Sequence, residues 1–541
     1  MGTGLVSAAA LTAVVAALGS QHLDRSLPAT LACAAAAVAV IAAFLHRRTD
    51  GRARGRLVGS LWGAALLVAV FAVVGLRADQ DLRGLERTLP DRVSGTAELG
   101  SDPESSRFGT DFELVADGRR WSATARRGVE GAVAGLATGD RIHVEGRAEP
   151  FEDAPHGWVR SRHLAGRVEL TAVEHAADTR PWFGAANAVH ELLERGAGSM
   201  DPDHRGLYLG LVVGDDRNQS ELTQFHFRAS GLTHLLAVSG QNLMFVLAVL
   251  APLSRRLGYR ARWVLGVGAV TAFVVVTRAE PSVLRAATMA ILGLSAAVVG
   301  RKVPAVRLVG LAVVGLLVAD PMLVHSVGFR LSVSATLGLV LLTRRIEERL
   351  AGPDAVRLPL AVTLAAQAGA VPVMVSTFGN VSLVAVPANV LAEPAAGLVM
   401  TLGLTTGLLS GLVREELASV LQVPVRAAVW WVDAVAATGA ELALPPSGLI
   451  VWAVIVGMTL ASVHLWRTRG SRMAGRVTVM ALVPMVVLLR PPLPSVGEVT
   501  PPWWVEPSCS APVRGGGCTW VTPCRTSAPA SRSSNGSGGW A

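Results

Sequence analysis

The chain contains 541 residues, of which 51% are hydrophobic and only 16% are charged. An average soluble domain carries about 25% charged residues, and disordered chains combine low hydrophobicity with high charge, so the composition argues against both classes. The formal net charge is +9 at pH 7, and the mean hydropathy is +0.45. The composition predicts a polytopic α-helical membrane protein whose positive charge favours anionic substrates or lipid headgroups.

Apolar stretches of membrane-spanning length recur along the chain. A bilayer core needs roughly 20 apolar residues per helix. The predicted spans are 4–19, 28–45, 57–76, 233–253, 261–277, 282–299, 305–319, 326–343, 358–378, 383–411, 418–440, 447–466 and 473–489. The stretch 383–411 is the weakest of them because Pro387 and Pro394 interrupt it. The first stretch has no basic residue before it, so we interpret it as an uncleaved helix.

Basic clusters predict the orientation of these spans, because cytoplasmic loops carry an excess of arginine and lysine. Each cluster follows an even-numbered span, and the loops on the opposite side carry almost none. The clusters lie at 47–56, 255–262, 301–307, 344–357 and 467–476. The pattern predicts a cytoplasmic N-terminus and an extracytoplasmic segment 77–232.

Segment 88–175 has a strand pattern rather than a helix pattern. Short alternating runs separated by turn signals such as Asp117-Gly118 predict strands at 92–99, 110–115, 120–126, 141–147 and 166–173. Five short strands are typical of a small Greek-key barrel such as an OB fold. We therefore expect an external all-β, OB-like domain. After it, apolar residues at helical spacing over 181–193 predict an amphipathic helix along the membrane surface.

Basic and aromatic residues are interleaved in this predicted barrel. Arginines follow phosphates and aromatic rings stack on bases, so the combination is typical of single-strand binding. The candidate DNA-binding residues are Arg119, Arg120, Trp121, Arg126, Arg127, Trp158, Arg160, Arg162 and Arg167. The same pattern is also expected of a solvated barrel whose aromatic residues lie in the core.

Polar residues inside the predicted spans mark a second candidate site, because polar groups at membrane depth are costly and usually line an interior. The candidate pathway residues are His234, Ser239, Gly240, Gln241, Asn242, Arg285, Arg330, Gln367, Asn389 and Glu393. Singly, each also fits a helix–helix contact. Together they favour a shared polar lumen, in which two arginines suit a polyanion and Glu393 is a candidate counter-ion.

Motifs for catalysis or cofactor binding do not occur in the sequence. The 12 histidines form no His-x-His, His-x-x-His or His-Glu-x-x-His, and there is no Cys-x-x-Cys or Gly-x-x-x-x-Gly-Lys. The sequence predicts no metal site, no cofactor and no enzyme activity, and any driving force for transport has to come from elsewhere.

Several motifs together resemble a known family. Leu209–Asp215, Phe227–Gly240, Arg278–Met289 and Gly328–Ser332 are similar, in that order, to the motifs of ComEC-type competence proteins, and Gln367 with Pro372 and Asn389 with Pro394 complete the set. The resemblance covers roughly residues 1–490. It implies a cell-membrane channel that imports single-stranded transforming DNA. It also implies a surface DNA receptor and a cytoplasmic ATPase or translocase as partners.

The resemblance also sets the expected domain organisation. We expect N-terminal transmembrane helices over 1–76, the barrel over 77–178, interfacial helices over 179–232 and the channel core over 233–490. Family members often end in a metallo-β-lactamase-like domain. Its ligand motif is absent from this sequence, and the Pro-, Gly- and Ser-rich segment 491–541 predicts a disordered tail, consistent with a frameshift.

The sequence leaves three other functions open. The first is a transporter of another anionic solute, such as a lipid-linked or sugar phosphate. The second is a truncated remnant without a nuclease domain. The third is an enzyme that acts at the membrane, against which the missing metal and nucleophile motifs argue.

Overall fold

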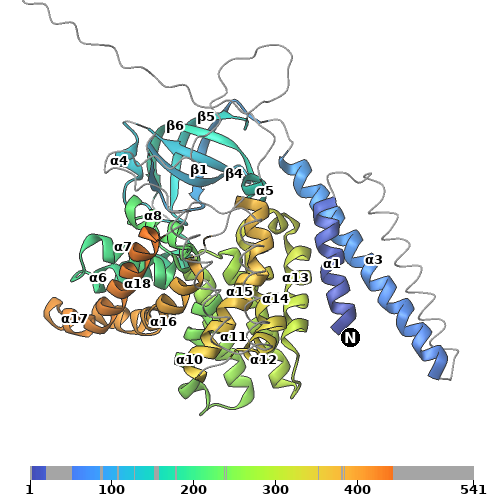
Figure 1. The fold of residues 1–541 in the computed structure, drawn as a ribbon. Helices are drawn as coiled ribbons and strands as arrows, with labels where there is room; N and C mark the ends of the chain where they lie inside the picture. The colour runs from blue at the N-terminus through green and yellow to red at the C-terminus, as the bar shows by residue number, and fades with distance from the viewer. Residues whose placement is uncertain are drawn as a thin grey trace, which may run out of the picture. The chain divides into compact units, whose positions relative to one another are not determined.

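The computed structural model in Figure 1 describes residues 3–19, 52–85, 89–106, 109–126, 128–151, 157–176, 179–236, 238, 240–350, 353–378, 382 and 384–442. The predicted spans 28–45, 447–466 and 473–489 and the segment 491–541 lie outside these residues. The candidate residues Arg127 and Ser239 lie outside them as well.

The strands form one sheet that closes into a barrel-like structure. They are β1 (Arg92–Leu99), β2 (Glu104–Ser106), β3 (Gly109–Ala116), β4 (Arg119–Ala125), β5 (Arg141–Glu149) and β6 (Leu164–Ala176). Their order is β1-β5-β6-β4-β3-β2, and a further pairing of β1 with β3 closes the barrel. Strands β4 and β6 are parallel, whereas the other pairs are antiparallel. The five predicted strands are confirmed, and β2 is an additional short strand.

The barrel is held together by an apolar core. Side chains of β5 alternate regularly between buried and exposed positions, as expected of a strand with one buried face. Leu114, Trp121 and Ile142 are among its fully buried side chains. Two short helices lie in the connections of the barrel. They are α4 (Glu130–Val133) between β4 and β5, and α5 (Gly157–Ser161) between β5 and β6.

Helices make up the rest of the described chain. They are α1 (Thr3–Gly19), α3 (Arg52–Leu85), α6 (Pro181–Gly196), α7 (Pro202–Val213), α8 (Glu221–Ser230), α9 (Thr233–Leu236), α10 (Gly240–Ser254), α11 (Tyr259–Val276), α12 (Pro281–Val298), α13 (Ala305–Ala319), the 3-10 helix η1 (Pro321–His325), α14 (Val327–Glu347), α15 (Asp354–Phe378), α16 (Ala385–Ser410), α17 (Glu415–Leu421) and α18 (Val423–Glu441).

Five of the described helices are long and apolar enough to cross a membrane, namely α11, α12, α14, the part of α15 from Arg357 onward, and α16. The pair α17 and α18 counts as a sixth if it is one span, and it bends by 55°. The apolar part of α1, α10 and α13 are shorter than a full span. The predicted span over 233–253 is divided between two helices, because α9 ends at Leu236 and α10 starts at Gly240.

Small residues let the spanning helices approach closely. At the contact between α14 and α15, a Cβ added to Gly338 would lie 2.3 Å from the carbonyl oxygen of Ala365. A Cβ added to Gly369 would lie 2.3 Å from the carbonyl oxygen of Ser334. Close backbone packing of this kind is how helices associate in lipid, where apolar burial gives no driving force.

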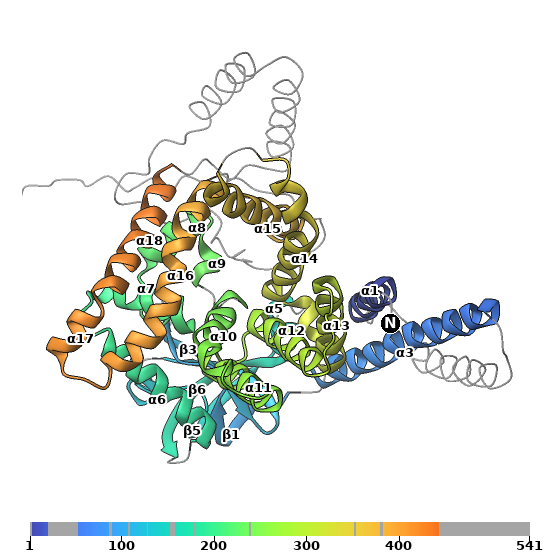
Figure 2. The same cartoon turned by 90° about the horizontal axis from the view of Figure 1, so that it is seen from below.

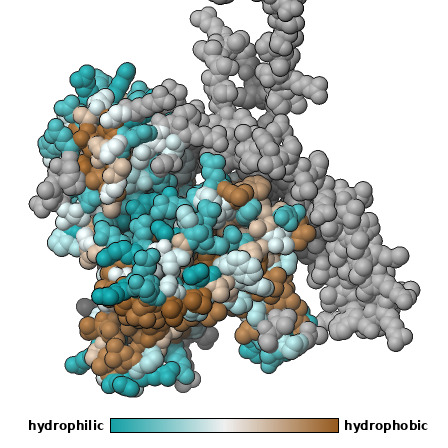
Figure 3. All heavy atoms as spheres, turned by 90° about the vertical axis from the view of Figure 1, so that its left-hand side faces the viewer, coloured by the Kyte–Doolittle hydropathy of each residue, from teal (hydrophilic) through white to brown (hydrophobic). Residues whose placement is uncertain are grey.

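Large apolar side chains are exposed along α16, α17 and α18. They include Leu391, Leu398, Leu402, Leu409, Leu412, Leu417, Val420, Trp430 and Trp431. Figure 3 shows the side of the molecule on which these helices lie, with an apolar region below a largely hydrophilic one. An exposed apolar surface of this extent is expected of helices that contact lipid.

The predicted amphipathic helix over 181–193 is confirmed as α6. Its buried residues Ala186, His190 and Leu193 share one face, and the helix contacts α16 and α11. Trp182, near its N-terminus, is 53% exposed. The apolar stripe of α6 is therefore covered at least partly by protein, and its location along a membrane surface stays a prediction.

Candidate nucleic-acid path

Five helices contact one another in a closed ring. Helix α10 contacts α12, α12 contacts α14, α14 contacts α15, α15 contacts α16, and α16 contacts α10. Figure 2 shows these helices as an arc, with the short helix α9 projecting inside it. All the described candidate pathway residues belong to this ring or to α9. They were selected from the sequence as polar residues within apolar stretches, or, for Gly240, as a position where the helix could loosen.

The candidate residues differ in their exposure. His234 on α9 and Gln241 on α10 are exposed, whereas Arg330, Gln367 and Glu393 are half-buried. Among the residues that the structure describes, the buried atoms Gln367 Oε1, Asn389 Oδ1 and Arg330 Nε have no hydrogen-bond partner. Unsatisfied polar atoms are costly at membrane depth and are usually paired with protein or water. The ring therefore has unused hydrogen-bonding capacity on α14, α15 and α16.

Three of the candidates are buried, namely Asn242, Arg285 and Asn389, and the first two form hydrogen bonds across helix contacts. Asn242 is 3% exposed, and its side-chain amide donates a hydrogen bond to the carbonyl oxygen of Leu211, at 3.0 Å. Arg285 is 7% exposed, and its Nε donates to the hydroxyl of Ser332, at 2.7 Å. Glu393 forms no ion pair with either arginine among the described residues, so the expectation of a counter-ion there is not met.

The barrel candidates separate into core, paired and exposed residues. The prediction of Trp121 as a stacking residue is wrong, because its side chain is 1% exposed and lies in the barrel core. Arg120 and Arg162 both pair with Glu113, at 3.2 and 3.1 Å. Arg126 pairs with Glu169 at 3.2 Å. Arg119 and Arg160 are half-buried.

One exposed aromatic and basic cluster remains on the barrel, and we call it the Trp158 patch. The rings of Phe151 and Trp158 meet edge to face with their centroids 5.8 Å apart. The guanidinium of Arg167 lies over the Phe151 ring, 5.4 Å from its centroid. Trp158 is 43% exposed. The sequence gives no signal for Phe151, which lies two residues beyond the end of β5, because a single aromatic residue near a strand end has no periodicity.

An ion pair joins the barrel to the helices. Arg278, between α11 and α12, donates from Nη2 to both carboxylate oxygens of Asp102, each at 2.9 Å. Its Nη1 donates to Asn187 Oδ1 on α6, also at 2.9 Å. Arg278 and Ala279 have φ angles of 57° and 56°, in the left-handed region that non-glycine residues rarely adopt. We call this contact the Asp102–Arg278 pair.

A second polar contact joins the barrel to η1. His163 Nε2 lies 3.1 Å from Oδ1 of Asp320, the residue that caps η1. The hydrogen bond to Asp320 raises the pKa of His163 above its ordinary value, against the opposing effect of burial. The protonated form of His163 therefore favours this contact.

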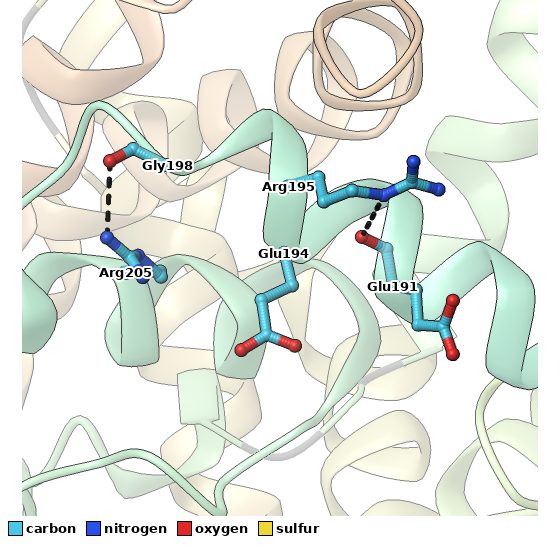
Figure 4. A pocket seen from close by; sticks show the side chains of 5 residues that line it. All are labelled: Glu191, Glu194, Arg195, Gly198 and Arg205. Carbon is cyan, nitrogen blue, oxygen red and sulfur yellow. Dashed lines mark hydrogen bonds between the residues drawn. The ribbon is translucent and has the colours of Figure 1, made fainter. Parts of the chain in front are cut away.

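A cavity of about 300 Å³ lies at the end of α6 and the start of α7, as Figure 4 shows. Its lining residues are Glu191, Glu194, Arg195, Gly198 and Arg205. Arg205 donates a hydrogen bond to the carbonyl oxygen of Gly198, at 3.2 Å. None of the predicted site residues lines this cavity. No group of three or more histidine, cysteine or acidic side chains in the described part of the chain is arranged to hold a metal ion.

Comparisons with known proteins give matches to the helical part of the chain. A protein-family model described as Competence protein matches residues 211–469. ComE operon protein 3 of Bacillus subtilis (strain 168) is 25% identical over 240 residues, which make up 44% of this chain and 30% of that protein. Residues 211–469 of this chain therefore form a competence-family region. No solved structure matches it.

The matched region begins in α7 and contains all five helices of the ring. The barrel precedes the matched region. The alignment with ComE operon protein 3 spans less than a third of that relative. The motifs that resembled the family in the sequence also lie mainly in the matched region, so the family assignment from sequence is confirmed.

Proposed function

We propose that this protein conducts single-stranded DNA across the cell membrane during competence, with the helix ring as the passage. The observation that carries the proposal is that all the described polar residues selected from the sequence belong to one closed ring of helices or to α9. Arginine and amide donors spread over several helices share phosphate contacts without holding any phosphate too tightly, as conduction requires.

We further propose that the barrel is an OB-like domain that captures the strand. The closed arrangement of β1, β3, β4, β5 and β6 is compatible with the five-stranded Greek-key barrel of that fold. OB folds bind oligonucleotides partly through the connection between their fourth and fifth strands. In this barrel that connection joins β5 to β6 and carries Phe151 and Trp158 of the Trp158 patch.

The proposed orientation has the N-terminus in the cytoplasm and the barrel outside. It is supported by the basic clusters, which follow alternate spans. Exposed basic residues of this kind lie at 255–262, in the connection between α10 and α11 and the first turn of α11, and at 301–302, between α12 and α13. In this orientation the strand meets the barrel before the ring. A surface DNA receptor would deliver it, and a cytoplasmic ATPase or translocase would pull it in.

Uptake of labelled DNA tests the proposal. A deletion strain is complemented with the wild-type gene or with an empty vector, and internalised single-stranded label is measured together with growth. We expect uptake only with the wild-type gene, and normal growth in both strains. Equal uptake in both strains contradicts the proposal. A growth or envelope defect with normal uptake would instead favour transport of a lipid-linked or sugar phosphate.

A further inference from the structure

Helix α10 has its N-terminus within the ring. The predicted fourth span is broken, so α9 ends at Leu236 and a new 15-residue helix begins at Gly240. A helix N-terminus carries a partial positive charge, because its first N–H groups have no acceptor within the helix.

The side chain of Arg285 lies against this helix N-terminus. A Cβ added to Gly240 would be 3.3 Å from Arg285 Nη2 and 2.7 Å from the Cβ of Ala286. Glycine at this position therefore allows α12 to approach the first turn of α10. Arg285 is 7% exposed, so a full positive charge and the positive end of a helix share one buried location.

The charge of Arg285 has no counter-ion among the described residues. Its Nε donates to Ser332 Oγ at 2.7 Å, and its Nη1 contacts the sulfur of Met289 at 3.4 Å; both partners are neutral. Its Nη2 makes no hydrogen bond with the described residues, and no acidic side chain there pairs with it. Burial of an unpaired charge is costly, so this arrangement favours a bound anion.

We propose that the N-terminus of α10 and Arg285 form a binding site for one phosphate group of the translocating strand. The inference rests on the proposed function for the identity of the anion. Helix N-termini and guanidinium groups are the two protein features that bind phosphate most readily, and here they converge. Ser332 on α14 orients Arg285 from the neighbouring helix of the ring, which leaves Nη2 directed at the start of α10.

Thermal unfolding of the purified full-length protein in detergent micelles tests the site. The probes are inorganic phosphate, a ten-nucleotide oligothymidylate and the same oligonucleotide with an uncharged methylphosphonate backbone. We expect phosphate and the charged oligonucleotide to raise the melting temperature of the wild-type protein. Arg285→Gln should weaken phosphate binding roughly tenfold to a hundredfold, the range for a charge-assisted hydrogen bond. Arg285→Lys should retain part of the affinity.

The stability of Arg285→Gln without phosphate separates an anion site from a structural arginine. Without phosphate, Arg285→Gln should be at least as stable as the wild type, because it removes an uncompensated buried charge. A structural arginine would instead lower the melting temperature of the variant in every buffer. Arg260→Gln, which changes an exposed arginine at the start of α11, is the matched control and should behave as wild type.

Three outcomes would overturn the site. The first is an equal phosphate-induced shift in wild type and Arg285→Gln. The second is no shift of the wild type with any probe. The third is a shift with inorganic phosphate that the charged oligonucleotide neither reproduces nor competes with, because this assigns the site to free phosphate.

Uptake measurements distinguish failure of the site from failure of the proposed function. If deletion of the gene abolishes DNA uptake and Arg285→Gln takes up DNA and binds the oligonucleotide as wild type does, the site is overturned and the channel function stands. If Arg285→Gln loses the phosphate-induced shift but deletion leaves uptake unchanged, the anion site stands and the channel function fails.

Discussion

The Asp102–Arg278 pair should account for a measurable part of the attachment of the barrel to the helices. Breaking a buried ion pair by removing one partner costs about 3–5 kcal/mol. Here the two side chains are 17% and 13% exposed, and Asp102 keeps its bonds from the Thr138 amide and hydroxyl, at 2.7 and 2.8 Å. Arg217 also remains 4.0 Å from Asp102. We therefore expect a coupling energy nearer to about 2 kcal/mol.

Hydrogen–deuterium exchange of the full-length protein in micelles measures this coupling. The Thr138 amide reports on it directly, because it donates to Asp102 Oδ1. A double-mutant cycle of Asp102→Asn and Arg278→Gln should give a non-additive change of roughly thirtyfold in the opening equilibrium, which corresponds to about 2 kcal/mol. Non-additivity below about 0.5 kcal/mol would refute the reasoning.

The backbone at Arg278 offers a second comparison within the same experiment. Glycine adopts positive φ without steric cost, whereas alanine does not. Since φ is 57° at this position, Arg278→Gly should destabilise the contact less than Arg278→Ala, by about 1 kcal/mol, although both remove the ion pair. Equal effects of the two substitutions would show that this backbone conformation is not strained.

Three further predictions concern other contacts. Trp158→Ala should weaken binding of single-stranded DNA by about 1–3 kcal/mol in a fluorescence titration. Trp182→Ala, which changes another exposed tryptophan, should leave the affinity unchanged. An unchanged affinity of Trp158→Ala would contradict strand capture by the Trp158 patch. Because the pKa of His163 is raised, its contact should be fully formed below about pH 6.5 and weaken as the pH rises through the raised value. Exchange near η1, corrected for the intrinsic rate, should therefore increase between pH 6 and pH 8. His163→Gln should abolish this pH dependence, and a pH dependence that survives it would count against this group. Gly338→Ala should lower the melting temperature, because the added Cβ disrupts the contact of α14 with α15. Gly315→Ala on α13 should be tolerated, because that position has open space around it. Equal melting temperatures of the two variants would show that the contact between α14 and α15 adjusts to the added Cβ.

The sequence predicts the barrel strands well, because alternation, turn residues and short spacing all indicate the same structure. It also predicts where the apolar helices lie. At the fourth span, apolar composition over 233–253 predicts the stretch as a whole but not its division into α9, which ends at Leu236, and α10, which starts at Gly240. Hydropathy measures only how apolar a stretch is, and a helix break depends on local backbone conformation.

The candidate site was predictable in part. Polarity within apolar stretches selected residues that share one ring of helices, because such residues are costly unless they face an interior. The same reasoning could not separate Trp121, which fills the barrel core, from the exposed Trp158. Both are aromatic residues among arginines, and only the fold decides which of them faces inward. Pairs such as Arg278 with Asp102 are also invisible to sequence spacing, because 176 positions separate them.

The position of β6 at the end of the barrel segment has a consequence for biogenesis. This last strand pairs with β5 on one side and with β4 on the other, so the earlier strands have unsatisfied edges until residue 176 has been synthesised. If the barrel is exported, its entire length has to cross the bilayer as an open chain before it closes. Export and closure of this segment would then be sequential events, and the strand edges would first become paired in the compartment that receives β6.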